Sequence, residues 1–278
     1  MKAKAYCLAF LTIVIVLLGV TAFDHIQRVQ QREKVRAEVL SQLSTIKARL
    51  ERGLNSRLFF EKGLHAFVLT HLEVDPGHQI TQAEVNRFGR EFMPQLLGVR
   101  NIALVQNDII THTYPLAGNE QTIGTDLSLV PGQKEALRKV EATHGSLLAG
   151  PAELLQGGTA LIYRAPIYWA PAGGTETYWG QVGMTLPMET LFREAGLDDQ
   201  AAGLTFALRG RDGLGRAGEL FWGEEAVLNS DPVVTEVDIP NGHWQLAAVP
   251  AGGWAPTGPL FYWIWVIGGF RCRNHGGT

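Results

Sequence analysis

The sequence has little cysteine and no excess of basic charge, and each absence excludes a class of function. Its two cysteines, Cys7 and Cys272, lie near opposite ends of the 278-residue chain, so the middle holds neither a disulfide nor a thiolate metal site. The formal net charge is −3, whereas a nucleic-acid-binding domain would show a basic stripe. We therefore expect no nucleic-acid partner. A hydrophobic content of 46% also argues against a disordered chain.

Signatures of catalysis and of cofactor binding are lacking too. No serine stands in a Gly-x-Ser-x-Gly context, and the interior of the chain has no thiol nucleophile. Residues 213–218 spell Gly-x-Gly-x-x-Gly, but a hairpin turn explains them better than a dinucleotide site, because no βαβ unit is expected there. Several histidines are scattered without a close i, i+4 pair, and we expect them to face solvent: His65, His71, His78, His112 and His144. We expect no catalytic residue, no cofactor and no metal ion.

The start of the chain is apolar. Residues 5–23 carry no charge, follow a basic start, and would extend roughly 28 Å as a helix, close to the hydrocarbon thickness of a bilayer. We interpret residues 1–23 as a transmembrane helix. The alternative is a cleaved signal peptide, with Val20 and Ala22 as the small residues before the cut.

A second apolar run occurs near the other end. Residues 255–270 are short for a span, and we expect a short second membrane helix there. Arg271 and Arg273 in the tail, 271–278, suit the cytoplasmic side. We therefore expect an inner-membrane protein with both termini cytoplasmic and the central part periplasmic.

Residues 24–74 have the rhythm of a helical stalk. Four apolar residues recur at spacings of four, three and four: Val39, Leu43, Ile46 and Leu50. Such a seam would pair with a copy of itself in a homodimer. The alternative is an amphipathic helix packed on its own domain, which we favour for the part after Gly53.

Beyond the stalk, the pattern changes to short strands separated by turns, with a Thr81-to-Glu84 capping box that opens a short helix. Residues 99–105 and 109–114 form a predicted hairpin, and two further strands flank the glycine-rich turn at 171–174. The order is not a β-α-β repeat, which indicates the α+β class with antiparallel sheets. We place one domain at 75–200 and a smaller one, next to the membrane, at 201–254.

Three motifs occur in order within residues 60–200: "YPLAGNEQTIGTDL" from Tyr114, "GPAELLQGGTALIYRAPIY" from Gly150 and "YWGQVGMTLPMETLF" from Tyr178. Together they resemble the CHASE sensory domain, the extracytoplasmic ligand-binding module of many bacterial membrane receptors and of plant cytokinin receptor kinases. The resemblance implies a long stalk helix followed by two PAS-like α+β domains, of which the membrane-distal one holds the ligand.

The resemblance also implies where a ligand would lie. In the plant receptors a carboxylate on the helix before the Gly-Pro motif reads an adenine ring, and its place falls at Gln133, whose amide cannot supply the same charge-assisted hydrogen bonds. A pocket-lining leucine matches Leu155, the adjacent Gln156 is a further candidate ligand-binding residue, and a threonine of the next strand is replaced by Arg164. We therefore expect a small anionic ligand rather than a cytokinin. The alternative is that Arg164 points outward and pairs with a surface glutamate.

The loop that starts the first motif would cross one end of the pocket, with Tyr114 and Asn119 as candidate ligand-binding residues. The expected function is that of a dimeric sensor that passes a signal through its membrane helices to a cytoplasmic output partner. No output domain follows residue 270, which suggests a truncated receptor or a stand-alone sensor. Two alternatives remain: a periplasmic scaffold that binds only protein, and an anchored periplasmic hydrolase.

Overall fold

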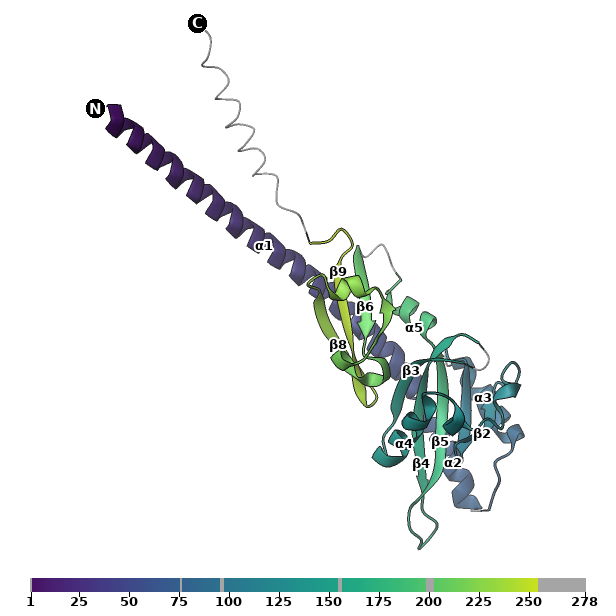
Figure 1. Cartoon of the computed structure of the whole chain (residues 1–278). Helices are drawn as coiled ribbons and strands as arrows, with labels where there is room; N and C mark the ends of the chain where they lie inside the picture. Colours follow the sequence, from purple (N-terminus) through teal and green to yellow (C-terminus); the bar gives the residue numbers. More distant parts are fainter. Residues whose placement is uncertain (1, 76, 96–97, 155–156, 199–202, 255–278) are drawn as a thin grey trace.

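A long helix, α1, runs from Lys2 to Leu58 and forms the axis of the molecule (Figure 1). The computed structural model describes residues 2–75, 77–95, 98–154, 157–198 and 203–254. The first part of α1 is long and apolar enough to cross a membrane, and its large side chains, such as Phe10 and Leu18, are exposed. This agrees with the predicted first transmembrane helix. The predicted second one, at 255–270, lies outside the described residues.

The apolar seam of the stalk packs within its own chain. Val39, Leu43, Ile46 and Leu50 are all buried, in one continuous core with residues of both sheets. The expectation that this seam pairs with a second copy is therefore wrong. The seam packs instead against the four-stranded sheet of the same chain, which lies along this stretch of α1 (Figure 1).

A short break at Phe59 and Phe60 separates α1 from α2, which spans Glu61–Val74. The loop that follows leads to α3, Gln82–Phe92, which begins with the predicted capping box. The Thr81 side chain accepts from the Glu84 backbone N–H, and the Glu84 carboxylate accepts from the Thr81 N–H. A 3₁₀ turn, Met93–Gln95, ends this helical segment.

The first sheet has five antiparallel strands in the order β2-β1-β5-β4-β3. Its strands are β1 Asn101–Gln106, β2 Ile109–Tyr114, β3 Leu147–Glu153, β4 Thr159–Trp169 and β5 Thr177–Pro187. The predicted hairpin between β1 and β2 is confirmed, with Asn107 and Asp108 both in the left-handed region at φ of 49° and 66°. The strand β3, which contains the Gly-Pro motif, had no counterpart in the sequence pattern.

Helix α4, Gln133–Thr143, follows the 3₁₀ turns Glu120–Thr122 and Leu127–Leu129 and lies over one face of this sheet (Figure 1). Val105, Leu127 and Leu137 form a small apolar cluster on that side. On the other face, Leu161, Tyr163 and Val182 belong to the main core together with α1 and α2. Because successive side chains of a strand point to opposite faces of the sheet, one face packs under α4 and the other against α1 and α2.

The second sheet has four antiparallel strands in the order β7-β6-β9-β8. Its strands are β6 Leu204–Arg209, β7 Leu220–Gly223, β8 Val233–Ile239 and β9 Gly242–Pro250. Helix α5, Met188–Ala195, connects the two sheets, and its Phe192 packs edge-on against Trp222 and Trp244. A short helix, α6, spans Glu225–Leu228. The glycine-rich residues 213–218 join antiparallel strands through 3₁₀ turns, Arg211–Gly213 and Gly215–Ala217, as the hairpin interpretation predicted.

Candidate functional site

A cavity of about 80 Å³ lies between the outer face of the five-stranded sheet and the segment that leads into α4. Four strands, β1, β2, β4 and β5, contribute apolar residues to its lining. Further apolar residues come from the segment before α4 and from the position after β3. The apolar lining residues are Ala103, Val105, Ile110, Leu127, Val130, Leu154, Ile162 and Met184. Its polar lining consists of Asn101, Thr122, Gln133, Glu153, Arg164 and Thr185. A mostly apolar hollow with a few converging polar groups is the usual form of a small-molecule site.

Arg164 is the most unusual of these polar groups. It lies on β4, and only 2% of it is exposed. Its Nη2 donates to Gln133 Oε1 at 2.5 Å, while its Nε has no hydrogen-bond partner among the residues the structure describes. Burial lowers the pKa of the guanidinium to about 10, because this site solvates the positive charge poorly.

No carboxylate in the described ranges forms an ion pair with Arg164. Tyr178 and Asp108 act on it only through longer-range electrostatics, and Asp108 itself pairs with Arg138 on α4. The alternative that Arg164 points outward to a surface glutamate is therefore excluded. A buried cation without a paired anion is costly, and an anionic ligand would relieve that cost.

Asn101 on β1 provides a complementary group. It is 5% exposed, and its Nδ2 donates to the Thr113 hydroxyl at 3.0 Å. Its Oδ1 has no donor within the described residues. Two residues of the cavity wall thus each carry a buried polar atom without a hydrogen-bond partner among the described residues: Asn101 an acceptor and Arg164 a donor.

The structure brings together two of the predicted ligand-binding residues, Gln133 and Arg164, which hydrogen-bond to each other at the cavity wall. Tyr114 and Asn119 are not part of the lining. The Tyr114 ring packs against Gly89 of α3, and the Asn119 side chain is buried with its Nδ2 donating to the Pro115 carbonyl at 2.9 Å. Both residues shape the loop instead of facing the cavity.

Leu155 and Gln156 lie outside the described residues, although their neighbours Glu153 and Leu154 line the cavity. Sequence reasoning missed four polar residues of the lining: Asn101, Thr122, Glu153 and Thr185. The signal for Asn101 was present, because Asn101, Ala103 and Val105 alternate along β1 and all face the cavity. Thr122 is placed by its loop and carries no comparable pattern.

The described residues combine a long helix with an apolar start, two antiparallel sheets and a small buried cavity. Among solved structures, the fold resembles an extracellular ligand-binding receptor from Desulfohalobium retbaense, with a TM-score of 0.57 and 14% identity over 76% of this chain. The chain spans only 40% of the length of that receptor.

Two further sensory domains are similar and are covered almost completely. The ligand-binding domain of the amino-acid chemoreceptor PctC of Pseudomonas aeruginosa, in complex with GABA, has a TM-score of 0.52 and 13% identity, over 77% of this chain and 99% of its own. The extracellular domain of the putative histidine kinase vpHK1S-Z8 has a TM-score of 0.53 and 10% identity, over 82% of this chain and 98% of its own. At these identities the likeness concerns the fold alone.

The family is established by sequence. The family model of the CHASE domain matches residues 77–222, which is more than half of the chain, and the chain belongs to this family. The resemblance noted from the three motifs is thereby confirmed. No curated protein sequence matches the chain.

Proposed function

We propose that this protein is a membrane-anchored sensor that binds a small carboxylate-bearing molecule in the cavity beneath α4. The observation that carries the proposal is the guanidinium of Arg164, which is 2% exposed, borders the cavity and has an unused Nε donor. A carboxylate is the partner whose geometry suits a guanidinium best. Gln133 would hold the arginine in place through its Oε1 contact.

The size and polarity of the cavity narrow the ligand further. A volume of about 80 Å³ is well below the roughly 300–1,000 Å³ of pockets for drug-sized ligands, so the ligand is small. The unpartnered Oδ1 of Asn101, a residue of the cavity wall, favours a ligand that also carries a donor, such as an ammonium group, once a small side-chain movement brings the two into contact. The PctC domain, which has a similar fold and was solved in complex with GABA, supports a ligand of this kind. An adenine-type hormone is disfavoured, since Gln133 stands where the plant receptors have a carboxylate.

The anchor and the assembly are further parts of the proposal. Residues 1–23 would span the inner membrane and 255–270 would return to it, leaving 75–200 as the membrane-distal ligand domain, 201–254 as the proximal one and both termini cytoplasmic. A homodimer would use the outward side of α1, where Leu40 is 46% exposed, because the seam from Val39 to Leu50 is already buried. The cytoplasmic ends would act on a separate output partner.

The test is calorimetry on the full chain in lipid nanodiscs with a panel of small carboxylates, amino acids including GABA, uncharged amides of the same size, and an adenine-type cytokinin. We expect a carboxylate or an amino acid to bind, its amide to bind at least about tenfold more weakly, and Arg164→Met to abolish binding. Arg90→Met, on the exposed side of α3, is the matched control and should bind normally. Tight cytokinin binding, or equal binding by Arg164→Met, would overturn the proposal.

A further inference from the structure

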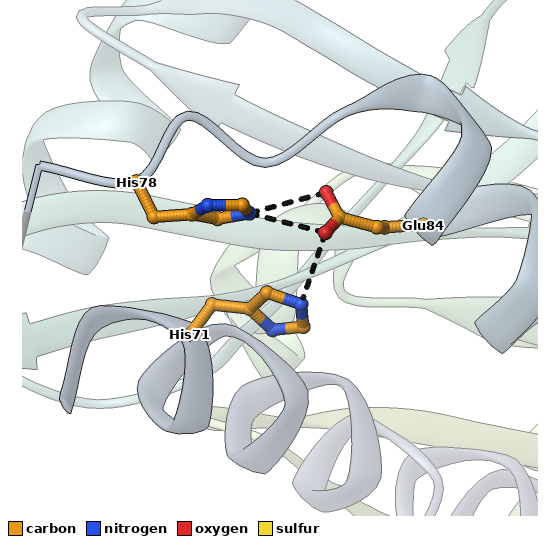
Figure 2. A group of neighbouring side chains, drawn as sticks. All are labelled: His71, His78 and Glu84. Carbon is orange, nitrogen blue, oxygen red and sulfur yellow. Dashed lines mark hydrogen bonds and ion pairs between the residues drawn. The ribbon is translucent and has the colours of Figure 1, made fainter. Parts of the chain in front are cut away.

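Two histidines and a glutamate meet at the junction of α2 and α3 (Figure 2). His71 lies in the last turn of α2, His78 in the connecting loop, and Glu84 in the first turn of α3. One ligand atom from each of the three residues lies within 4.8 Å of the others. The expectation of scattered histidines is therefore wrong for His71 and His78, which the turn between the helices brings together.

The hydrogen bonds of His71 fix which of its nitrogens is available. Its Nδ1 lies 2.8 Å from the Phe67 carbonyl, and since a carbonyl only accepts, Nδ1 must carry the proton. In the neutral ring, Nε2 is then an acceptor, and it faces Glu84 Oε1 at 3.6 Å. Two acceptors at this distance repel each other unless a proton or a metal cation lies between them. Histidine ligands of metals commonly have their other nitrogen fixed by a carbonyl in this way.

The two carboxylate oxygens of Glu84 have different surroundings. Oε2 accepts from the backbone N–H and the hydroxyl of Thr81, both at 2.7 Å. Oε1 lies 3.1 Å from His78 Nε2 and 3.6 Å from His71 Nε2, and Oε2 also lies 3.2 Å from His78 Nε2. The helix cap thus holds Oε2, His78 contacts both oxygens, and only Oε1 also faces His71.

We propose that His71, His78 and Glu84 bind a divalent transition-metal ion of the zinc class through Nε2, Nε2 and Oε1. Imidazole and carboxylate are ligands that zinc prefers, with bonds of about 2.0–2.1 Å. In a tetrahedral shell such bonds place neighbouring ligand atoms roughly 3.3 Å apart, close to the 3.1 and 3.6 Å separations found here. The three side chains are 25–30% exposed, which leaves water access to a fourth position.

A bound metal would fasten α3 to α2. The consequence reaches the cavity, because Gln82 of α3 donates to the Thr113 carbonyl at 2.8 Å, and the Thr113 hydroxyl accepts from Asn101 of the cavity wall. Burial lowers the pKa of His112 of β2, and the charge of Glu84 acts on it in the opposite direction. The site therefore lies at the edge of the ligand domain and separate from Arg164.

The test is Co²⁺ titration of the full chain followed by its visible d–d absorption, with Zn²⁺ competition and thermal unfolding before and after a chelator. We expect one ion per chain, a chelator-reversible rise in melting temperature, and a loss of affinity of at least about tenfold in His71→Ala, His78→Ala and Glu84→Gln. Glutamine also forms a capping box at this position. A loss of metal affinity in Glu84→Gln would therefore not reflect a disrupted helix.

His65→Ala is the matched control, because this histidine lies on α2 and contacts only Glu61 among the ion pairs of the described residues. Arg164→Met should bind the metal normally, which separates this site from the proposed ligand cavity. If the wild type shows no d–d band, or if the three variants bind cobalt as tightly as the wild type, the metal proposal fails. A melting temperature that responds to pH and not to metal would instead identify a protonated His–Glu cluster.

Discussion

Replacing Arg164 and Gln133 together by apolar side chains should stabilise the unliganded protein while it abolishes ligand binding. The two residues bond to each other at the cavity wall and are 2% and 7% exposed. If the guanidinium serves to bind a ligand, its burial lowers the free energy of unfolding of the unliganded protein. A variant with Arg164→Met and Gln133→Leu removes that cost and leaves neither partner behind.

The magnitude follows from the lowered pKa. A fall from 12.5 to about 10 corresponds to about 3 kcal/mol against the charged form. The lost hydrogen bond between the two side chains offsets about 1 kcal/mol of this. The double variant should therefore be about 2 kcal/mol more stable, which is about 4–8 °C in melting temperature for a domain of this size. The single variant Arg164→Met gains less, because an orphaned Gln133 Oε1 costs about 1–3 kcal/mol.

The assay is thermal and urea unfolding of the full chain in nanodiscs without added anions, followed by circular dichroism, with Arg90→Met as the control for removing a positive charge. The control should change stability by no more than about 0.5 kcal/mol. A double variant that is less stable than wild type by 2 kcal/mol or more would refute the reasoning, because Arg164 would then be a structural group that the fold already satisfies.

Three further predictions concern the framework around the two sites. Gly89→Ala should destabilise the protein by about 1–3 kcal/mol, because the new Cβ would lie 2.2 Å from the Tyr114 ring. Gly63→Ala, whose Cβ would have no neighbour closer than 3.7 Å, should instead stabilise it by up to about 1 kcal/mol through helix propensity. Urea unfolding of the two variants measures both effects. Leu43 of α1 is fully buried against the second sheet, and Leu43→Ala should lower the free energy of unfolding by about 2–5 kcal/mol in the same assay. The hydrogen bonds from Thr81 lower the pKa of Glu84 from 4.5 to about 2. The ionised Glu84 therefore stabilises the fold fully above pH 4.5, and this contribution is lost as the pH falls toward 2. Glu84→Gln should remove this pH dependence from the melting-temperature profile.

The elements that local chemistry determines could be predicted from the sequence. Asn107 and Asp108 are residues that tolerate left-handed backbone, and they form the turn between β1 and β2 as expected. The Thr81 and Glu84 pair forms its capping box for the same reason. By contrast, β3 escaped prediction because glycine and proline interrupt it, with Gly150 at a φ of 107°.

What depends on distant partners could not be predicted. The spacing of Val39 and Leu43 fits a coiled coil and a helix packed on its own sheet equally well, and only the tertiary fold chooses between them. His71 and Glu84 are 13 positions apart in sequence, and the turn at the end of α2 brings them together. Gln133 and Arg164 were selected by family resemblance, since nothing local marks an α4 amide and a β4 cation as partners.

The two faces of β4 set a limit on how ligand binding can reach the membrane. Arg164 faces the cavity, while the preceding residue, Tyr163, lies in the core on the opposite face and contacts Glu61 of α2 at 3.4 Å. A ligand biases the helices only by the difference in its affinity for two arrangements, and a tenfold preference supplies about 1.4 kcal/mol. Unpacking even one buried leucine of α1, such as Leu43 or Leu50, costs more than this. In the proposed sensor, a ligand with a tenfold preference would therefore have to move α1 as a rigid body together with the sheet it packs against, because that preference is smaller than the cost of separating them.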